Sequence, residues 1–533
     1  MRIQIQKPLF AWDCLEDHPA LLTIKDLLAA IPDQRLLEGL EAARGKGRDD
    51  YPVRTLWGVV VLTIALRHTG FEACLGELRR NPVLAKLIGI QSAAGIPHGW
   101  NVSRFLETLG QPPHLTELQA VFNWMIQRLG KVVPDLGRAT AGDATALKAR
   151  RQRCDVQKEK EAAEAAAQGV GPGPAAAPAA EKASTGVPAA SPTSPASNAE
   201  EKAGKTGKAD KIEYDKHGLP KPSGGRKEYT DDKGNVTKVM EWFGYKLHLL
   251  VDTKHEVALA YRISSSKAGD NEVLPELVDQ GRANLPPGRM KTLAYDKAAD
   301  DAKVHEKLHA CGIRPVIQNR ALWKGEKEQL LPGHDGNSNI VYDEAGTLYC
   351  YDRVSRPMVR RPMAYIGHEA ARGTLKYRCP AMHDGLPCAM SGICNAGKKY
   401  GLTIRVKQEI DLRRFPPIPR ATKQFERLYK GRTSVERVNA RFKIFWGADD
   451  GNVTGPERFH AMVGMVMVVH AAFATLLASA PRREGTLGKM RLSPIAKALH
   501  QQMVAGKGKA RARGEMRKKG KRGETRQARL FAA

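Results

Sequence analysis

The sequence predicts a mixed α/β protein that begins with an all-α N-terminal domain. Apolar residues recur at helical spacing through the first 130 or so residues. Between residues 240 and 320, short β-rich runs alternate with amphipathic helical patterns. A period near 3.6 residues indicates a helix, whereas short runs of β-branched and aromatic residues bounded by turns indicate strands. A helical domain is therefore expected before a domain that is built on a sheet.

The N-terminal helices are predicted from one long apolar face and two shorter segments. Residues 57–66 form a short apolar helix, and another helix is expected to begin near Asn101. A longer helix repeats its apolar residues every three or four positions, as a helix with one buried face does. Those residues are Leu115, Leu118, Phe122, Met125 and Leu129.

Two acidic residues lie close to the ends of predicted strands, namely Asp143 in the run from residue 140 to 147 and Asp296 after residues 291–295. Further elements are a hairpin of strands 240–252 and 257–263, a helix at 271–280, a helix up to about 309 and a strand at 313–318. The resulting order is strand, hairpin, helix, strand, helix, strand. This order predicts a ribonuclease-H-like catalytic core.

Composition separates the remaining segments of the chain. Residues 157–211 contain no aromatic residue and no Leu, Ile or Met, so disorder is expected there because little apolar surface can be buried. The pattern becomes irregular and cysteine-bearing after residue 320, and the last fifty residues are rich in Lys and Arg. The expected segments are a helical N-terminal domain (1–135), the first core strand (136–153), an Ala/Pro/Lys-rich linker (154–236), the continued core (237–320), an irregular insertion (321–407), the C-terminal core helices (408–482) and a basic tail (483–533).

Charge and apolar content indicate a polyanionic partner and no membrane span. The 85 Lys and Arg residues outnumber the 57 Asp and Glu residues, which gives a net charge of +28. Nucleic acid is the simplest partner for such an excess, and an anionic membrane surface is the alternative. Residues 461–480 have the length of a span, but they include His470 and are better explained as a buried helix. The start of the chain lacks a secretory signal pattern, and the eight cysteines are too sparse for a disulfide scaffold, so a reducing cytoplasm is expected.

The stretch from residue 429 to 443 carries the most specific pattern, Y-x2-R-x3-E-x6-K. On a helix, spacings of four and seven residues return to one face, so Arg432, Glu436 and Lys443 align there, with Tyr429 one step back. An acid can hold a divalent metal, and cations can hold a DNA backbone. The alternative is structural, because Thr433 and Glu436 also have the spacing of a helix capping box.

This pattern resembles the Y-R-E-K signature of bacterial insertion-sequence DDE transposases. The resemblance implies a metal-dependent DNA transposase in which Asp143, Asp296 and Glu436 bind Mg²⁺ or Mn²⁺. Two metals about 4 Å apart activate the attacking oxygen and stabilise the leaving oxygen in phosphodiester chemistry, and carboxylates are suitable ligands. Members of the family commonly have Gly-Tyr shortly after the second acid, whereas this chain has Lys-Ala-Ala-Asp after Asp296. Asp300 and Asp301 therefore compete with Asp296 for the second position.

The resemblance also implies the partners and the order of reaction. Water would cleave DNA at the element ends, and the resulting 3′-OH would attack target DNA. Tyr429, Arg432 and Lys443 would contact phosphates near the cut, while Trp446 would either assist them or pack in the core. The expected partners are double-stranded DNA, as element inverted repeats and as target, and a second copy of the chain in a synaptic complex at the nucleoid.

Two further interpretations of the catalytic core remain open at this stage. One is a ribonuclease-H-like nuclease without strand transfer, and the other is a catalytically inactive DNA-binding relic. The N-terminal helical domain is expected to recognise element ends, although a plain helical bundle without DNA contact would give the same pattern.

Four cysteines, Cys350, Cys379, Cys388 and Cys394, fall inside the predicted insertion. Four thiolates, or three with His383, could hold a structural Zn²⁺ and order a segment that has little apolar core. No pair has the close C-x2-C spacing of a zinc knuckle, so scattered free thiols are the alternative.

Overall fold

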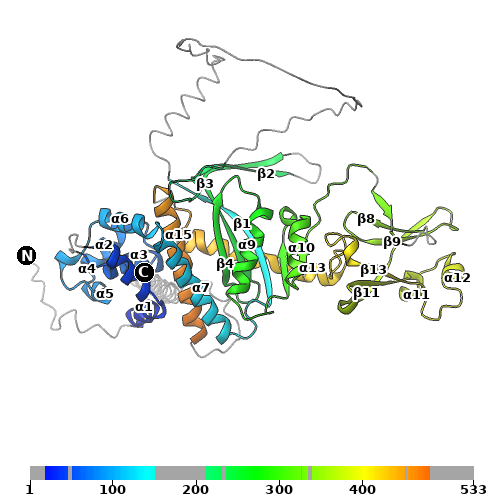
Figure 1. Cartoon of the computed structure of the whole chain (residues 1–533), viewed down its shortest axis with the longest axis horizontal. Coiled ribbons are helices and arrows are strands. Elements are labelled where there is room, and N and C mark those ends of the chain that lie inside the picture. Colours follow the sequence, from blue (N-terminus) through cyan, green and yellow to red (C-terminus); the bar gives the residue numbers. More distant parts are fainter. Residues whose placement is uncertain are drawn as a thin grey trace, which may run out of the picture.

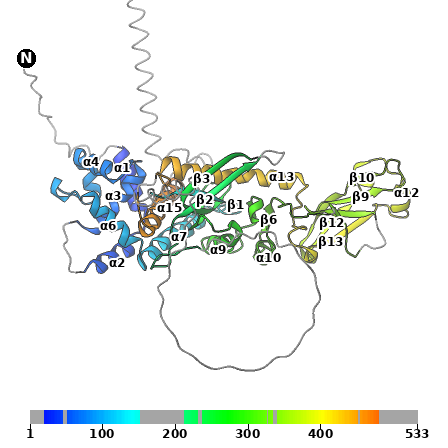
Figure 2. The ribbon, with the colours of Figure 1, turned by 90° about the horizontal axis from the view of Figure 1, so that it is seen from above.

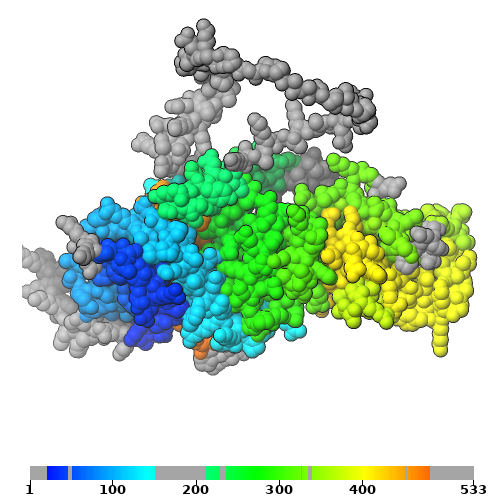
Figure 3. Space-filling model, in the orientation of Figure 1, coloured from blue at the N-terminus to red at the C-terminus, as the bar shows by residue number. Residues whose placement is uncertain are grey.

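The computed structural model describes residues 19–45, 51–150, 212–230, 236–325, 327–333, 339–450 and 453–479. The molecule is elongated, with a helical bundle at one end, a sheet in the middle and the insertion at the far end (Figure 1). The view from above gives the same sequence of parts (Figure 2), and the space-filling view shows them as one continuous body (Figure 3). Residues 154–211 of the predicted linker (154–236) and the basic tail lie outside the described residues.

The N-terminal region is helical, as predicted. Its apolar faces pack against one another and against the C-terminal helix α15, so the bundle and the sheet share one hydrophobic core. In α7 the buried side chains follow the predicted spacing, with Leu118, Phe122, Met125 and Leu129 inside and Leu115 partly buried. The helices are α1 (Pro19–Ala30), α2 (Gln34–Arg44), α3 (Val53–Ala65), α4 (Phe71–Arg80), α5 (Pro82–Leu87), α6 (Gly99–Leu109) and α7 (His114–Val132).

The central sheet has the strand order β4-β3-β1-β5-β6. Strand β3 lies antiparallel between β1 and β4, while β5 runs parallel to both β1 and β6. This is the mixed sheet of a ribonuclease-H-like core, so the predicted fold class is confirmed. The strands are β1 (Ala139–Lys148), β3 (Val236–Asp252), β4 (Ala258–Ser265), β5 (Thr292–Tyr295) and β6 (Arg314–Ile317).

A further strand, β2 (Ser223–Thr230), pairs with the first half of β3. The predicted linker therefore extends too far, because residues 212–230 are described and include this strand. Gly244 is the residue of β3 that both neighbouring strands reach, since it pairs with Ser223 on β2 and with Lys148 on β1. Gly244 has φ 154°, and an added Cβ would lie 2.1 Å from the Leu147 carbonyl oxygen, so this position requires glycine. The β2 sequence lacks apolar alternation, which is why pattern analysis missed the strand.

Helices cover the sheet, and the long apolar helix α15 (Pro456–Ser479) lies between the sheet and the bundle (Figure 1). By length and composition α15 is the one candidate membrane span in the described residues, but 72% of its most apolar window is buried inside the protein. Its buried His470 accepts a hydrogen bond from the Ala258 backbone N–H at 3.0 Å. These contacts identify α15 as a core helix, as predicted. The other helices on the core are α9 (Asp270–Ala283), α10 (Ala302–Ala310), α13 (Lys423–Tyr429) and α14 (Thr433–Ala440).

The insertion is more regular than its sequence predicts. It contains a four-stranded sheet, β10-β9-β8-β7, and a three-stranded sheet, β11-β12-β13, around a small core of its own that includes Leu348, Leu375 and Phe415. The strands have only three to six residues and carry many Arg, Lys and Tyr residues, so they leave almost no periodic signal. The elements are β7 (Glu328–Leu330), β8 (Ile340–Asp343), β9 (Leu348–Asp352), β10 (Val359–Pro362), β11 (Ala364–Glu369), β12 (Thr374–Arg378), α11 (Pro380–Asp384), α12 (Ser391–Cys394) and β13 (Thr403–Lys407).

Candidate active site

Asp143 and Asp296 lie beside each other on neighbouring parallel strands. Asp143 is in β1, and Asp296 is the first residue after β5. The last paired residues of the two strands are Ala141 and Ala294, each two residues before an aspartate, and the charge of Asp296 acts on Asp143. The fold therefore brings two carboxylates together that are far apart in the sequence.

Glu436 lies in α14, which packs on β1 and β3. The Y-R-E-K stretch is not the single straight α-helix that its spacing predicts. It begins at the end of α13, continues through a 3₁₀ turn at Lys430–Arg432 and α14, and ends in a π-helical turn at Arg441–Phe445. The residue spacing does not reveal the change of helix type, because 3₁₀-, α- and π-helical turns are similar coils that differ mainly in the spacing of their backbone hydrogen bonds.

Arg432 joins the helical stretch to the first strand. Its guanidinium donates a hydrogen bond to the Glu436 carboxylate at 2.7 Å and lies 3.9 Å from Asp143 Oδ1. The capping-box interpretation of Glu436 is wrong, since the α14 N-cap is Arg432 and makes no side-chain cap. The Thr433 hydroxyl donates instead to the Lys430 carbonyl.

Tyr429 and Lys443 complete the motif near the same acids. The Tyr429 ring stacks on Phe425 with centroids 5.8 Å apart, and the Arg432 guanidinium lies 5.9 Å from the Tyr429 ring centroid. Lys443 Nζ is 4.0 Å from Asp449, and burial lowers the pKa of the Lys443 amine. The charges of Arg432 and Lys443 thus act close to Asp143.

The environment of Asp143 disfavours its negative charge. Burial raises the pKa of the Asp143 carboxyl to about 6, and the neighbouring charge of Asp296 acts in the same direction. Arg432, Lys227 and the Ala144 N–H oppose this shift. A divalent cation would relieve the repulsion between the two carboxylates, and an all-oxygen donor set suits Mg²⁺. In the described part of the chain, however, no three His, Cys, Asp or Glu side chains lie close enough to hold a metal without adjustment.

Lys227 is a cation near Asp143 that the sequence analysis did not single out. It lies on β2, in the stretch that was assigned to the linker, yet its charge reaches Asp143. The sequence around Lys227 shows only an Arg-Lys pair that follows two glycines. The pairing of β2 with β3, which places Lys227 beside the core, cannot be read from those residues.

The two competitors of Asp296 have structural partners. Asp300 is buried and accepts hydrogen bonds from Arg413, Arg420, His305 and the Arg320 backbone N–H. These donors hold the pKa of the Asp300 carboxyl down at about 2 despite its burial. Asp301 caps α10 by accepting from the Lys303 N–H.

Trp446 packs in the core, which excludes it from direct DNA contact. It is 6% exposed and stacks on Phe473, with Phe442 and His470 at its edges. An aromatic residue with that burial contributes to packing.

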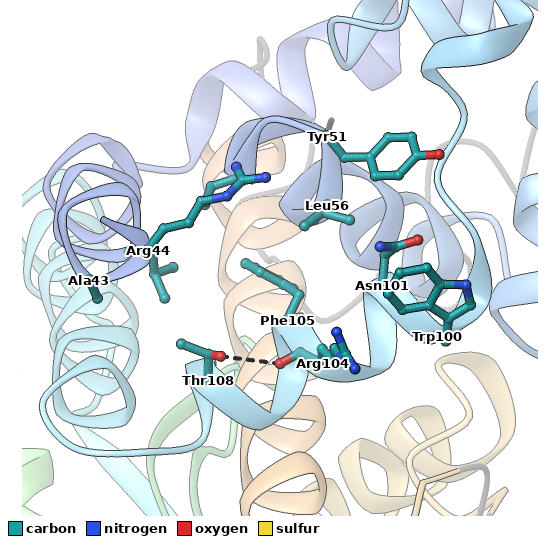
Figure 4. Close-up of a pocket in the computed structure, with 11 residues that line it drawn as sticks. Ala43, Arg44, Tyr51, Leu56, Trp100, Asn101, Arg104, Phe105 and Thr108 are labelled. Atoms are coloured by element: carbon teal, nitrogen blue, oxygen red, sulfur yellow. Dashed lines mark hydrogen bonds between the residues drawn. The ribbon is translucent and has the colours of Figure 1, made fainter. Parts of the chain in front are cut away.

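The helical bundle contains a cavity of about 500 Å³ on its surface (Figure 4). Arg44, Tyr51, Trp100 and Arg104 lie around it, drawn from α2, α6 and the loop before α3. Trp100 is 56% exposed, and the Arg104 guanidinium lies 5.1 Å from its ring centroid. Aromatic faces with nearby guanidinium groups are the chemistry that binds nucleic-acid bases and phosphates.

Comparison with known families gives a match to the model described as the transposase DDE domain, over residues 207–471. This is about half of the chain, and it includes Asp296 and the whole Y-R-E-K stretch but not Asp143. Among the curated proteins no match is found. The structure connects Asp143 to the matched region, because β1, which carries Asp143, lies between β3 and β5 of that region.

Proposed function

The chain belongs to the DDE transposases, enzymes that cleave DNA and transfer its strands, and we propose that Asp143, Asp296 and Glu436 form its catalytic triad. The observation that carries this assignment is the convergence of the two aspartates with Arg432 and Glu436 from the helical stretch. Asp300 is less suitable, because both of its oxygens accept structural hydrogen bonds. Asp301 and Asp296 each accept one cap hydrogen bond, and we prefer Asp296 because it follows β5, the strand that pairs with β1.

We propose that the triad holds Mg²⁺, for which Mn²⁺ can substitute. Transposases of this family use divalent metal ions, and carboxylate oxygens are the ligands that Mg²⁺ prefers. When bound, the metal supplies activation of the attacking oxygen and charge stabilisation of the leaving oxygen. The raised pKa of Asp143 supports the assignment, since this carboxylate lacks full compensation from the protein alone.

The surrounding cations would position the DNA. Arg432, Lys443 and Lys227 all lie close enough to Asp143 for their charges to act on it, so a phosphodiester would be attracted to the acids. Tyr429 presents a ring that is half-buried against Phe425 and would contact the backbone or a displaced base.

One site would serve both reaction steps. Water attacks the phosphorus at the element end, the bond to the 3′ oxygen breaks, and a 3′-OH remains. That hydroxyl then attacks a target phosphodiester, joins the element end to the target and releases a target 3′-OH. The first step hydrolyses one phosphodiester, and the second exchanges one phosphodiester for another, so strand transfer needs no external energy source. A nuclease without strand transfer and an inactive DNA-binding relic are not favoured for a chain of this family.

The substrate is DNA, and we propose that the element inverted repeats contact the N-terminal bundle. The cavity around Trp100, Tyr51, Arg44 and Arg104 supports a DNA contact there. The net charge of +28 favours nucleoid association of a protein that is expected to be soluble and cytoplasmic. We also propose that two copies of the chain act together, since a synaptic complex joins two element ends.

Cleavage of DNA that carries the gene's own flanking repeats tests the triad. With Mg²⁺, wild-type protein should nick at the repeat boundary, and EDTA should abolish nicking. Asp143→Asn, Asp296→Asn and Glu436→Gln should each reduce cleavage at least ~1000-fold while leaving DNA binding, because each removes a metal ligand but little volume.

Asp301→Asn is the matched control, because it makes the same chemical change five residues from Asp296. Cleavage that survives Asp296→Asn but is lost in Asp301→Asn would overturn the assignment of the second carboxylate. DNA binding without cleavage by the wild type, under either metal, would overturn the proposal as a whole.

A further inference from the structure

The four cysteines of the insertion come from three separate pieces of chain. Cys350 lies in β9, Cys379 follows β12, Cys388 lies in the loop after α11, and Cys394 ends α12. All four are free cysteines, with Cys379 buried and the others partly buried.

Hydrogen bonds bring these pieces of chain together. The Asn395 side-chain amide donates to Cys379 Sγ at 3.6 Å, so the end of α12 lies against the end of β12. The Ala389 N–H donates to Asp352 at 2.7 Å, and the Arg353 N–H donates to the Met390 sulfur at 3.2 Å. The segment that follows Cys388 is therefore fixed to the end of β9, two residues beyond Cys350.

The segment from residue 381 to 400 has no apolar core that could order it. None of its side chains is buried, and its larger apolar residues face solvent, with exposures of 39% for Met382, 41% for Leu386 and 70% for Ile393. The small core of the insertion draws its buried residues from the strands and Phe415, and takes none from this segment. Small elements that lack apolar burial are usually held by disulfides or by a metal.

We propose that Cys350, Cys379, Cys388 and Cys394 together bind one structural Zn²⁺. Four thiolates are a complete tetrahedral set for zinc, and no position is left open for catalysis. The hydrogen bond that reaches one of these sulfurs supports the assignment, because the Asn395 amide donates to Cys379 Sγ at 3.6 Å. Donors of this kind stabilise metal-bound thiolates.

Binding requires a local adjustment, because no three such side chains in the described ranges form a finished cage. We propose that rotation of cysteine side chains between staggered rotamers supplies this adjustment, because hydrogen bonds already hold the backbone segments together. The cost of such rotation is small compared with the binding free energy of structural zinc.

The metal content of full-length protein tests the site. Protein purified without chelators and dialysed against zinc-free buffer should retain one zinc per chain by elemental mass spectrometry. Cobalt exchanged into the site should give the intense thiolate-to-cobalt absorption of a four-sulfur tetrahedral centre. Asp143→Asn and Glu436→Gln should keep this zinc, which separates it from the triad metal and makes the result independent of the triad proposal.

Cys388→Ser and Cys394→Ser should each lose the zinc, and proteases should then cut within residues 381–400 faster than in the wild type. Cys311→Ser is the matched control, because this partly buried cysteine lies in the core between α10 and β6. Wild-type protein that holds no zinc after equilibration with it, or that shows these cysteines paired as disulfides, would overturn the proposal. Retention of zinc and of the cobalt spectrum in Cys388→Ser would also overturn it.

Discussion

The Arg432 guanidinium lies 3.9 Å from the Asp143 carboxylate and so connects the helical stretch to the first strand of the sheet. The same guanidinium holds Glu436 at 2.7 Å. One cation therefore bridges an acid that the family match includes and an acid that it does not. This contact ties Asp143 to the matched region by geometry as well as by sheet pairing.

Arg432→Ala is expected to slow cleavage by ~10- to 100-fold, because the bridge and a phosphate contact are both lost. Arg432→Lys should recover only part of the activity, since an ammonium cannot reproduce the guanidinium geometry. Single-turnover cleavage at saturating Mg²⁺ measures the effect. Arg427→Ala removes an exposed arginine of the adjacent α13 and should change the rate less than twofold. Equal losses in both variants would show that Arg432 has no special role.

Asp143→Asn is expected to stabilise the protein in EDTA at pH 7.5 by ~1–3 kcal/mol, as removal of a desolvated charge does. The folded-state pKa of about 6 exceeds the ordinary 3.8, so the folded protein binds this proton more tightly than the unfolded chain. The wild type should therefore lose stability as pH rises from about 4 to 6, and the Asn variant should not. Urea unfolding across this pH range measures the difference. A variant that is less stable than the wild type at pH 7.5 would contradict the expectation.

Asp300→Ala is expected to lower the free energy of unfolding by ~3–5 kcal/mol, because it leaves two arginines without their buried partner. The pKa of Asp300 is depressed from 3.8 to about 2, so its contribution is present above pH 4 and lost as pH falls towards 2. Chemical unfolding at pH 7 and pH 3 measures both statements. Asp301→Ala removes only a helix cap and should cost ~1 kcal/mol. Similar losses at the two positions would contradict the special role of Asp300.

Glu256→Ala is expected to destabilise the protein by ~2–4 kcal/mol and to slow cleavage, because Glu256 fixes the helix that carries Glu436. Its carboxylate accepts from Arg437 at 2.6 Å and forms a close ion pair with Arg441. Thermal unfolding and single-turnover cleavage measure the two effects. Glu426→Ala breaks an exposed pair with Lys430 and should leave the free energy of unfolding almost unchanged. A cleavage rate unaffected by Glu256→Ala would show that α14 is held in place by packing alone.

Local patterns were sufficient for the parts of the site that depend on one element. A strand-like run that contains Asp143, another that ends at Asp296, and the spacing of the Y-R-E-K residues could be seen directly. The choice between Asp296 and Asp300 could not, since it depends on Arg413 and Arg420, which lie more than a hundred residues further along the chain.

Other features left no pattern in the sequence. Strand β2 depends on its partner β3 rather than on apolar alternation, and the strands of the insertion are too short to show a period. The π-helical turn of the motif ends beside a contact between the Phe442 and Trp446 rings, and residue spacing reports neither the change of helix type nor the contact.

The arrangement at Gly244 has a consequence for the evolution and engineering of the chain. Lys148 and Ser223 face this one glycine from opposite sides, so the sheet fixes both ends of the intervening segment independently of its length. The entropy of closing a loop grows only slowly with loop length. The segment between Lys148 and Ser223 should therefore tolerate a natural insertion or an added reporter domain with little disturbance of the fold. It should also tolerate a cut that divides the protein into two co-expressed fragments. Separately made parts of the enzyme could thus be joined within this segment, between two strands of one sheet.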